Sequence, residues 1–391
     1  MPALPHDADA PPLATPAFIY DERGIRDRLA LFDRIREISG VNLLYSIKAQ
    51  PFAGILELIA PAVAGFSVSS LFEARLASGI LNTLSHPVAA VHLTTPGLRA
   101  GEMPALGQQC TTVSFNSLEQ CRRLLPALDA SVPVGLRVNP RHSVIADARY
   151  DPCRAHSKLG IPLEDLKAAL EEDAGLASRI SGIHFHTQFG ATDAGPLQAI
   201  LQKLEEQLGT RLDALQWINL GGGYDPPAEA GALALGRVIR AFRERHALEV
   251  WMEPGQAIVG EAGSLLTTVV DCFERDGQAI AVLDTGVQHL PEVFEYQRAP
   301  PLKEHRSEGA HAVLLAGCSC LAGDLFGEYR FARPLSVGDR VTFERVGAYS
   351  LIKASWFNGY GLPSVYLRKP GGRMQHMKSY AYEDYHKQWS T

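Results

Sequence analysis

The chain of 391 residues is long enough for one α/β domain of about 250 residues and a smaller second domain. Its hydrophobic fraction of 46% and charged fraction of 20% are typical of globular proteins, and a formal net charge of −6 argues against nucleic acid or an anionic membrane as a partner. No apolar run approaches the ~20 residues of a membrane helix, and Asp7 and Asp9 oppose a secretory signal. The six scattered cysteines then indicate reduced thiols in a cytoplasmic protein.

The run at residues 17–20 resembles a strand, and eight short apolar runs rich in β-branched residues follow it, each leading into a longer amphipathic stretch. These eight runs are residues 43–47, 65–69, 90–94, 112–115, 134–138, 182–186, 216–220 and 249–253. Strands that alternate with helices indicate a parallel sheet joined by crossovers, and eight such units predict a (β/α)8 barrel of the TIM type.

The pattern changes after Glu253. Short β-prone segments, punctuated by Gly, Pro and Asp, predict a mostly antiparallel β domain. These segments are residues 264–272, 279–283, 312–316, 340–343 and 364–367. We therefore expect a barrel over residues 22–258 and a β domain over 259–391, joined by the N-terminal strand at 13–21.

Several reactive residues fall where the barrel strands are expected to end, which is where such barrels build their active sites. Lys48 follows the first run, and a desolvated lysine there can form an imine with an aldehyde cofactor. A lysine that extends its charge to the rim is the alternative. The glycines Gly221, Gly222 and Gly223 follow the seventh run and suit a phosphate, although a tight turn also explains them.

Glu253 follows the eighth run and is a candidate to face the ring nitrogen of such a cofactor, the alternative being a surface glutamate. His184 and His186, two apart on the sixth run, are expected on one face. We interpret His186 as stacked on the cofactor ring and His184 as a core residue. No carboxylate or third histidine is spaced to complete a metal site, and the pair Cys318 and Cys320 has no second pair nearby, so we expect no metal.

Four strings resemble the fold-type III pyridoxal-phosphate decarboxylases, which share an alanine-racemase-like barrel, and within them the carboxynorspermidine/carboxyspermidine decarboxylases. The resemblance runs from residue 15 to about residue 366. The strings are Ser-Ser-Leu-Phe-Glu-Ala-Arg at 69–75, Tyr-Asp-Pro-Cys at 150–153, Cys-Leu-Ala-Gly-Asp at 320–324 and Phe-Asn-Gly at 357–359.

The resemblance implies pyridoxal 5′-phosphate as the cofactor, held as a Schiff base on Lys48, and an obligate homodimer with two shared active sites. It implies that Tyr349 assists the glycines at the phosphate, and that Cys320 enters from the partner subunit to reprotonate the substrate carbon. A thiol is mostly protonated at neutral pH and can donate a proton; a small buried hydrophobic residue is the alternative for Cys320. It further implies that Asp324 contacts the distal amine of a basic substrate.

Three departures from the family affect the substrate. Gln-Phe-Gly at 188–190 replaces the usual Leu-Cys-Glu, Cys-Ser at 318–319 replaces Pro-Thr, and Glu292 stands where Asp is usual in the substrate-facing segment that includes His289. We expect decarboxylation of carboxynorspermidine or carboxyspermidine in polyamine biosynthesis. Decarboxylation of another amino-acid conjugate, an amino-acid racemase and a non-catalytic cofactor carrier are the alternatives. Cys320 argues against a racemase, which usually uses a tyrosine, and the β domain argues against a carrier.

Overall fold

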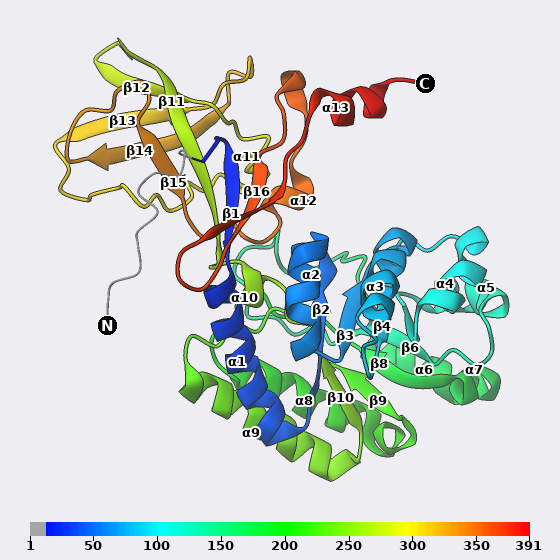
Figure 1. The fold of residues 1–391 in the computed structure, drawn as a ribbon. Helices are drawn as coiled ribbons and strands as arrows, with labels where there is room; N and C mark the ends of the chain where they lie inside the picture. Colours follow the sequence, from blue (N-terminus) through cyan, green and yellow to red (C-terminus); the bar gives the residue numbers. More distant parts are fainter. Residues whose placement is uncertain (1–12) are drawn as a thin grey trace, which may run out of the picture. The chain divides into compact units, whose positions relative to one another are not determined.

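The computed structural model describes residues 13–391, so Asp7 and Asp9 lie outside the described part. The chain forms two compact units (Figure 1). One unit is Gly24–Gly260, and the other combines the described residues before Gly24 with Glu261–Thr391.

The first unit contains a closed barrel of eight parallel strands. The strands are β2 (Asn42–Ser46), β3 (Gly65–Val68), β4 (Ala90–Thr95), β5 (Thr112–Phe115), β6 (Val134–Asn139), β8 (Ile180–His184), β9 (Trp217–Asn219) and β10 (Glu249–Met252). Each strand pairs with the next, and β10 pairs with β2, which closes the ring. The two-residue strand β7 (Ile161–Pro162) adds to β6. The predicted barrel is thereby confirmed.

One helix precedes the first strand of the barrel, and further helices connect its successive strands (Figure 1). They are α1 (Glu22–Ser39), α2 (Ala53–Ile59), α3 (Leu71–Thr83), α4 (Met103–Gln109), α5 (Leu118–Leu124), α6 (Leu163–Glu172), α7 (Ala174–Arg179), α8 (Gly195–Leu208) and α9 (Glu229–His246), with α10 (Gln256–Val259) after the last strand. In α8 the apolar residues that recur at helical spacing are all buried, as the 3.6-residue period requires: Leu197, Ile200, Leu201, Leu204 and Leu208. α8 therefore buries one apolar stripe along its length.

Aromatic side chains fill part of the barrel interior. Trp217 and Trp251 form a buried cluster with Leu44 and Ala90. A Cβ atom at Gly135 or Gly182 would lie 2.2 or 2.1 Å from the Trp217 ring, so glycine on these strands makes room for the indole. The barrel is thus a packed core, and chemistry is confined to the ends of its strands.

The second unit is built on an eight-stranded mixed sheet. Its strands are β1 (Ala17–Asp21), β11 (Gly263–Arg275), β12 (Gln278–Leu283), β13 (His311–Ala316), β14 (Leu325–Phe331), β15 (Arg340–Phe343), β16 (Ser364–Arg368) and β17 (Met374–Lys378). β1 lies between β11 and β16, and β15 pairs with β11. The pairs β1–β16 and β12–β13 are parallel and the others are antiparallel, so the sheet is mostly antiparallel as predicted.

Several elements of this unit carried no clear sequence signal. They are β14, β17 and the helices α11 (Pro291–Tyr296), α12 (Ser350–Lys353) and α13 (Tyr382–Trp389). In β14 the pairing shifts register where Gly327 adopts φ +121°, which breaks the alternation of buried and exposed residues. Within residues 13–391, no helix is long and apolar enough to cross a membrane.

Candidate active site

The barrel residues singled out in the sequence lie just beyond the strand ends. Lys48 lies in the 3-10 turn Ile47–Ala49 that follows β2, and Glu253 directly follows β10. His184 ends β8, so His186 lies two residues past the strand and the expected alternation does not extend to it. Phe185 N donates to Asn219 O at the end of β9 (2.9 Å), and the strand pairing stops at this point.

The amine of Lys48 is prepared to lose its proton. The side chain is exposed, yet the protein packed around it lowers the pKa of the ammonium group by desolvation. The negative charge of Glu253 opposes this shift, whereas the guanidinium of Arg137 reinforces it. Arg137 lies on β6 and is itself buried, with 8% of its surface accessible. The unprotonated amine is the form that attacks an aldehyde, and a lowered pKa increases the fraction of this form.

Glu253 is a buried and ionised carboxylate. Its Oε1 accepts a hydrogen bond from Asn219 Nδ2 (2.8 Å), and its Oε2 lies 3.5 Å from His184 Nε2. Burial alone would raise the pKa of Glu253, but the interactions with His184 and Lys48 outweigh burial and lower it. The carboxylate is therefore negative throughout the physiological pH range.

The ring of His186 is neutral and fixed in orientation. Burial lowers its pKa well below the usual value, and the positive charges of Lys48 and Arg137 lower it further. Gly222 N donates to His186 Nδ1 (2.9 Å), so this nitrogen is an acceptor and the neutral ring carries its proton on Nε2. The hydrogen bond joins the histidine to the glycine loop.

The glycine loop needs its glycines for steric reasons. A Cβ atom at Gly221, Gly222 or Gly223 would lie 2.4, 2.4 or 2.0 Å from a backbone oxygen of the neighbouring segments. Gly221 and Gly223 also adopt φ +67° and +87°. Gly221 N donates to Asn219 Oδ1 (2.9 Å), so two of the three amides have partners within the protein. A phosphate at this loop stays a prediction, and Gly223 is the glycine whose amide suits it best.

Other polar residues of this cluster were not singled out in the sequence. Asn219 precedes the glycines, and Arg137 is a lone charge within an apolar run. Glu73 forms a near capping box: Ser70 Oγ accepts from Glu73 N (3.2 Å), and Ser69 N donates to Glu73 Oε2 (2.6 Å). The Ser-x-x-Glu spacing was a signal for this cap, whereas nothing in the spacing places Asn219 beside Glu253.

The second unit holds the other predicted residues. His289 is fully buried; its Nδ1 contacts Thr285 Oγ1 (2.9 Å), and burial lowers its pKa to about 4. Glu292 Oε2 accepts from Ser350 Oγ (3.3 Å), while burial raises the pKa of this carboxyl group. His289 Nε2, Glu292 Oε1 and both amide atoms of Gln288 are buried without a hydrogen-bond partner in the described chain. Unpartnered buried polar atoms are costly, so their concentration in residues 288–292 indicates a binding segment.

Three further residues belong to this unit. Cys320 is exposed, and its backbone N donates to Asn358 Oδ1 (2.9 Å). Asp324 is 3% exposed, and its carboxylate accepts hydrogen bonds from the protein itself. Tyr349 adopts φ +66° at the start of α12, and burial raises its pKa.

No group of three or more potential metal ligands occurs within residues 13–391.

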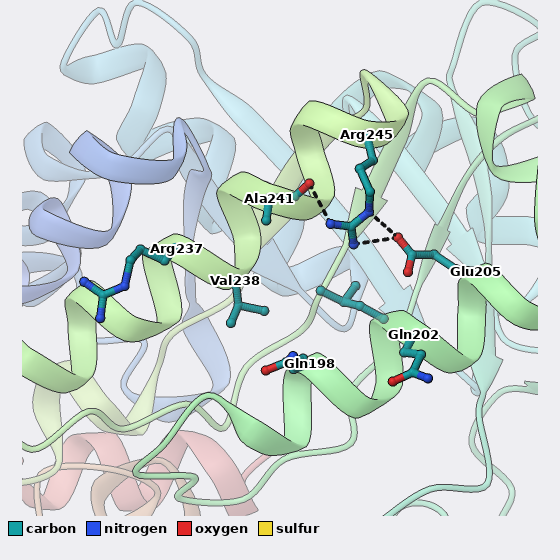
Figure 2. Close-up of a pocket in the computed structure, with 8 residues that line it drawn as sticks. Gln198, Gln202, Glu205, Arg237, Val238, Ala241 and Arg245 are labelled. Atoms are coloured by element: carbon teal, nitrogen blue, oxygen red, sulfur yellow. Dashed lines mark hydrogen bonds and ion pairs between the residues drawn. The ribbon is translucent and has the colours of Figure 1, made fainter.

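A cavity of about 380 Å³ opens between α8 and α9 (Figure 2). Arg245 spans its wall, where it donates to Glu205 Oε1 and to Ala241 O. Outer helices line this cavity, whereas TIM-type barrels build their active sites at the C-terminal ends of their strands. We therefore do not assign this cavity to the active site.

A family model for the pyridoxal-dependent decarboxylase, C-terminal sheet domain, matches residues 17–347. The chain belongs to this family. The decarboxylase is 32% identical to the carboxyaminopropylagmatine decarboxylase of Synechocystis sp. over 379 residues, 95% of either chain. It is 28% identical to the carboxynorspermidine/carboxyspermidine decarboxylase of Herminiimonas arsenicoxydans, with 95% of this chain and 98% of the relative covered.

The decarboxylase also resembles a crystal structure of carboxynorspermidine decarboxylase from Campylobacter jejuni complexed with norspermidine. The TM-score is 0.85 at 27% identity, and the match covers 96% of this chain and 100% of the other. The expected fold class and reaction are thereby confirmed, and the racemase and the cofactor carrier are set aside.

The decarboxylase uses pyridoxal 5′-phosphate, and its barrel cluster fits this cofactor. Lys48 offers an amine of lowered pKa, and Glu253 offers an ionised carboxylate for a protonated ring nitrogen. The neutral ring of His186 is a flat, uncharged surface for stacking. The cofactor accepts the electrons that remain on the substrate carbon when CO2 leaves.

Proposed function

We propose that this decarboxylase removes CO2 from carboxynorspermidine or carboxyspermidine in polyamine biosynthesis, specifically in the formation of spermidine-type products. One observation carries the proposal: relatives matched over 95% of the chain act, by their names, on carboxylated polyamines. The buried segment 288–292, with its unpartnered acceptors, supports a substrate that carries amines.

The barrel residues prepare the cofactor. Lys48 would bind its aldehyde carbon, His186 would stack on its ring, and Glu253 would keep its ring nitrogen protonated. Gly221, Gly222 and Gly223, with Tyr349, would hold the phosphate. Each of these roles rests on the resemblance of the sequence to the family, together with the burial and charge of the residue described above.

The second unit supplies the substrate contacts and a proton. Cys320 would donate its thiol proton to the carbon that loses CO2. Glu292 would accept a hydrogen bond from a substrate ammonium, because its Oε1 has no partner in the described chain. His289 would line the same site, where its Nε2 is likewise unpartnered.

We further propose a cytoplasmic homodimer with shared active sites. All six cysteines are free, which supports a reducing compartment. Leu321 is 40% exposed beside Cys320, and Phe294, 53% exposed, would lie 3.3 Å from a Cβ atom at Gly323. Exposed apolar side chains around the proton donor support an interface at this loop.

A substrate panel tests the reaction. CO2 release is measured with carboxynorspermidine, carboxyspermidine, carboxyaminopropylagmatine and diaminopimelate, with Lys48→Ala as the inactive control. We expect kcat/KM for the first two acids to exceed that for diaminopimelate by at least about 100-fold, equivalent to ~2.7 kcal/mol. Turnover of diaminopimelate or another amino acid, with none of the carboxylated polyamines, would refute the proposal. Preference for carboxyaminopropylagmatine would instead identify a substrate that carries a guanidine group.

Mixing two inactive variants tests the shared sites. A heterodimer of Lys48→Ala and Cys320→Ala protomers would contain one site with both substitutions and one intact site. Random exchange makes about half of the dimers mixed, so about one quarter of the wild-type activity is expected to return. No recovery, despite exchange seen by mass spectrometry, contradicts a site that combines two protomers.

A further inference from the structure

The loop that carries Cys320 is closed at its base. Gly317 N donates to Asp324 O (2.8 Å), which joins the two ends of the segment, and Asp324 N donates to Leu321 O (2.9 Å). A neighbouring segment adds a further link, because Cys318 N donates to Thr285 O (3.0 Å). The proposed proton donor therefore lies within a short loop whose two ends are fixed together.

The carboxylate of Asp324 lies inside this loop and is held from two sides. Its Oδ1 accepts from Val287 N (2.7 Å) on the neighbouring segment. Its Oδ2 accepts from Ser319 N (2.9 Å) and from Ser319 Oγ (2.5 Å), directly before Cys320. Within residues 13–391, no lysine or arginine forms an ion pair with Asp324, so these donors compensate for its burial.

Two glycines leave the space that this carboxylate occupies. A Cβ atom at Gly317 would lie 2.1 Å from Asp324 Oδ1, and one at Gly286 would lie 2.2 Å from Gln288 Oε1 and 2.6 Å from Asp324 Oδ2. Neither glycine has a positive φ, so the reason for glycine is the close approach of side chains, which is that of the carboxylate at Gly317 and that of the carboxylate and the Gln288 amide at Gly286. The backbone of both segments is therefore built around Asp324.

We infer that Asp324 is a positioning residue that fixes the Cys320 loop, and that it does not bind the distal amine of the substrate. Both of its oxygens already accept hydrogen bonds, and 3% of its surface is exposed. This differs from Glu292, where one oxygen is unpartnered. The inference rests on the proposed role of Cys320 as proton donor.

The consequence lies in the proton transfer. The S–H bond of Cys320 breaks as a C–H bond forms at the carbon that has lost CO2, and the thiolate regains a proton from solvent. Such a transfer requires close and directed approach, and a displacement of about 1 Å can reduce its rate by about 100-fold. Loosening the loop should therefore impair product formation more than substrate binding.

The test compares holoenzymes of Asp324→Asn, Ser319→Ala and the control Asp339→Asn. Asp339 also fixes a loop of this unit, through Arg333 and Ser336 N, and these hydrogen-bond partners lie outside the Cys320 loop. Amide hydrogen exchange of the peptide 317–324 is measured first, without substrate. Then kcat, KM and the amine formed per CO2 released are determined with the best substrate of the panel.

For Asp324→Asn we expect at least about tenfold faster exchange in the loop and a kcat for amine lower by about 10- to 100-fold, with KM within about twofold. Amine formed per CO2 should also fall. Ser319→Ala should shift the same values in the same direction by a smaller factor, and it decides the matter if Asp324→Asn does not fold. Asp339→Asn should leave loop exchange and the amine-to-CO2 ratio unchanged.

A raised KM with unchanged kcat and exchange would overturn the inference and make Asp324 a substrate contact. Unchanged exchange in both loop variants would overturn it as well. If the wild type turns over none of the carboxylated polyamines, the proposed substrate fails, and hydrogen exchange still decides whether Asp324 holds the loop.

Discussion

Replacing Asn219 by alanine is expected to weaken the barrel site without touching any group proposed to react. The Asn219 side chain bridges two parts of the site, because its Nδ2 donates to Glu253 Oε1 (2.8 Å) and its Oδ1 accepts from Gly221 N (2.9 Å). Alanine removes both bonds. Asn219 is 1% exposed, so neither partner is replaced easily by bulk water.

The magnitude follows from the two bonds. A hydrogen bond to a charged group contributes about 1.5–3 kcal/mol, and one between neutral groups about 1 kcal/mol. We therefore expect the variant to lose about 2–4 kcal/mol of unfolding free energy at pH 7. The same charge-assisted bond helps to keep Glu253 ionised, so affinity for the cofactor should fall by roughly 10- to 150-fold.

The pH dependence has a definite sign. Because the folded pKa of Glu253 is lowered, its ionisation stabilises the fold above its unfolded value of about 4.3 and this contribution is lost as pH falls towards the folded value. In Asn219→Ala the folded pKa moves back towards the unfolded one. The difference from the wild type should be full at pH 7 and shrink below about pH 4.

Urea unfolding of the apoprotein at several pH values, followed by cofactor titration, checks this prediction. Asn219→Asp is the matched variant, since it keeps an acceptor for Gly221 N but places a second carboxylate against Glu253. It should bind the cofactor more weakly than the alanine variant at pH 7. A loss of less than about 0.5 kcal/mol in Asn219→Ala, with unchanged cofactor affinity, would refute the reasoning.

Three further outcomes are expected. Lys48→Ala should abolish the absorption band of the cofactor linked to lysine, whereas Lys203→Ala, a lysine of α8, should retain it; a retained band in the first variant contradicts the assignment. Gly222→Ala should lose about 1–3 kcal/mol of unfolding free energy, because its Cβ would lie 2.4 Å from Glu253 O, while Gly79→Ala, with nothing within 4 Å, should lose none. Glu292→Gln should raise KM for a polyamine substrate and also raise the Tm of the free protein at pH 8. The folded pKa of Glu292 is raised, so its stability contribution is lost as pH rises, and the gain in Tm should vanish near pH 4.

The barrel could be predicted because its strands are short, apolar and regularly spaced. The run before Lys48 and the run before Glu253 lie within a residue of the observed strand ends. The second sheet was harder to predict from the sequence. The parallel pairing of β12 with β13 depends on the path of the intervening chain and not on the local residue pattern. The register shift at Gly327 interrupts the alternation of buried and exposed residues in β14, so the sequence pattern does not predict this strand.

The candidate site shows the same division. Lys48, Glu253 and the glycines follow strand ends, so the topology alone brings them to one region. The bond from Gly222 N to His186 Nδ1, and the bridge made by Asn219, depend on loop conformations that the spacing of residues does not determine. The partners of Asp324 are equally nonlocal, because Val287 lies 37 residues away in sequence.

Three buried carboxylates of this decarboxylase differ in how many of their oxygens already accept a hydrogen bond, and therefore in whether they can bind a further group. Asp324 has donors on both oxygens and is enclosed by backbone, so its charge is committed to holding a loop. Glu253 is held by Asn219 at one oxygen, and its negative charge still acts on Lys48, whose pKa it raises. Glu292 has one buried oxygen without a partner, and burial disfavours its charged form. A cationic substrate would supply both the missing donor and the missing positive charge, which makes Glu292 the carboxylate of the three whose environment is completed by binding.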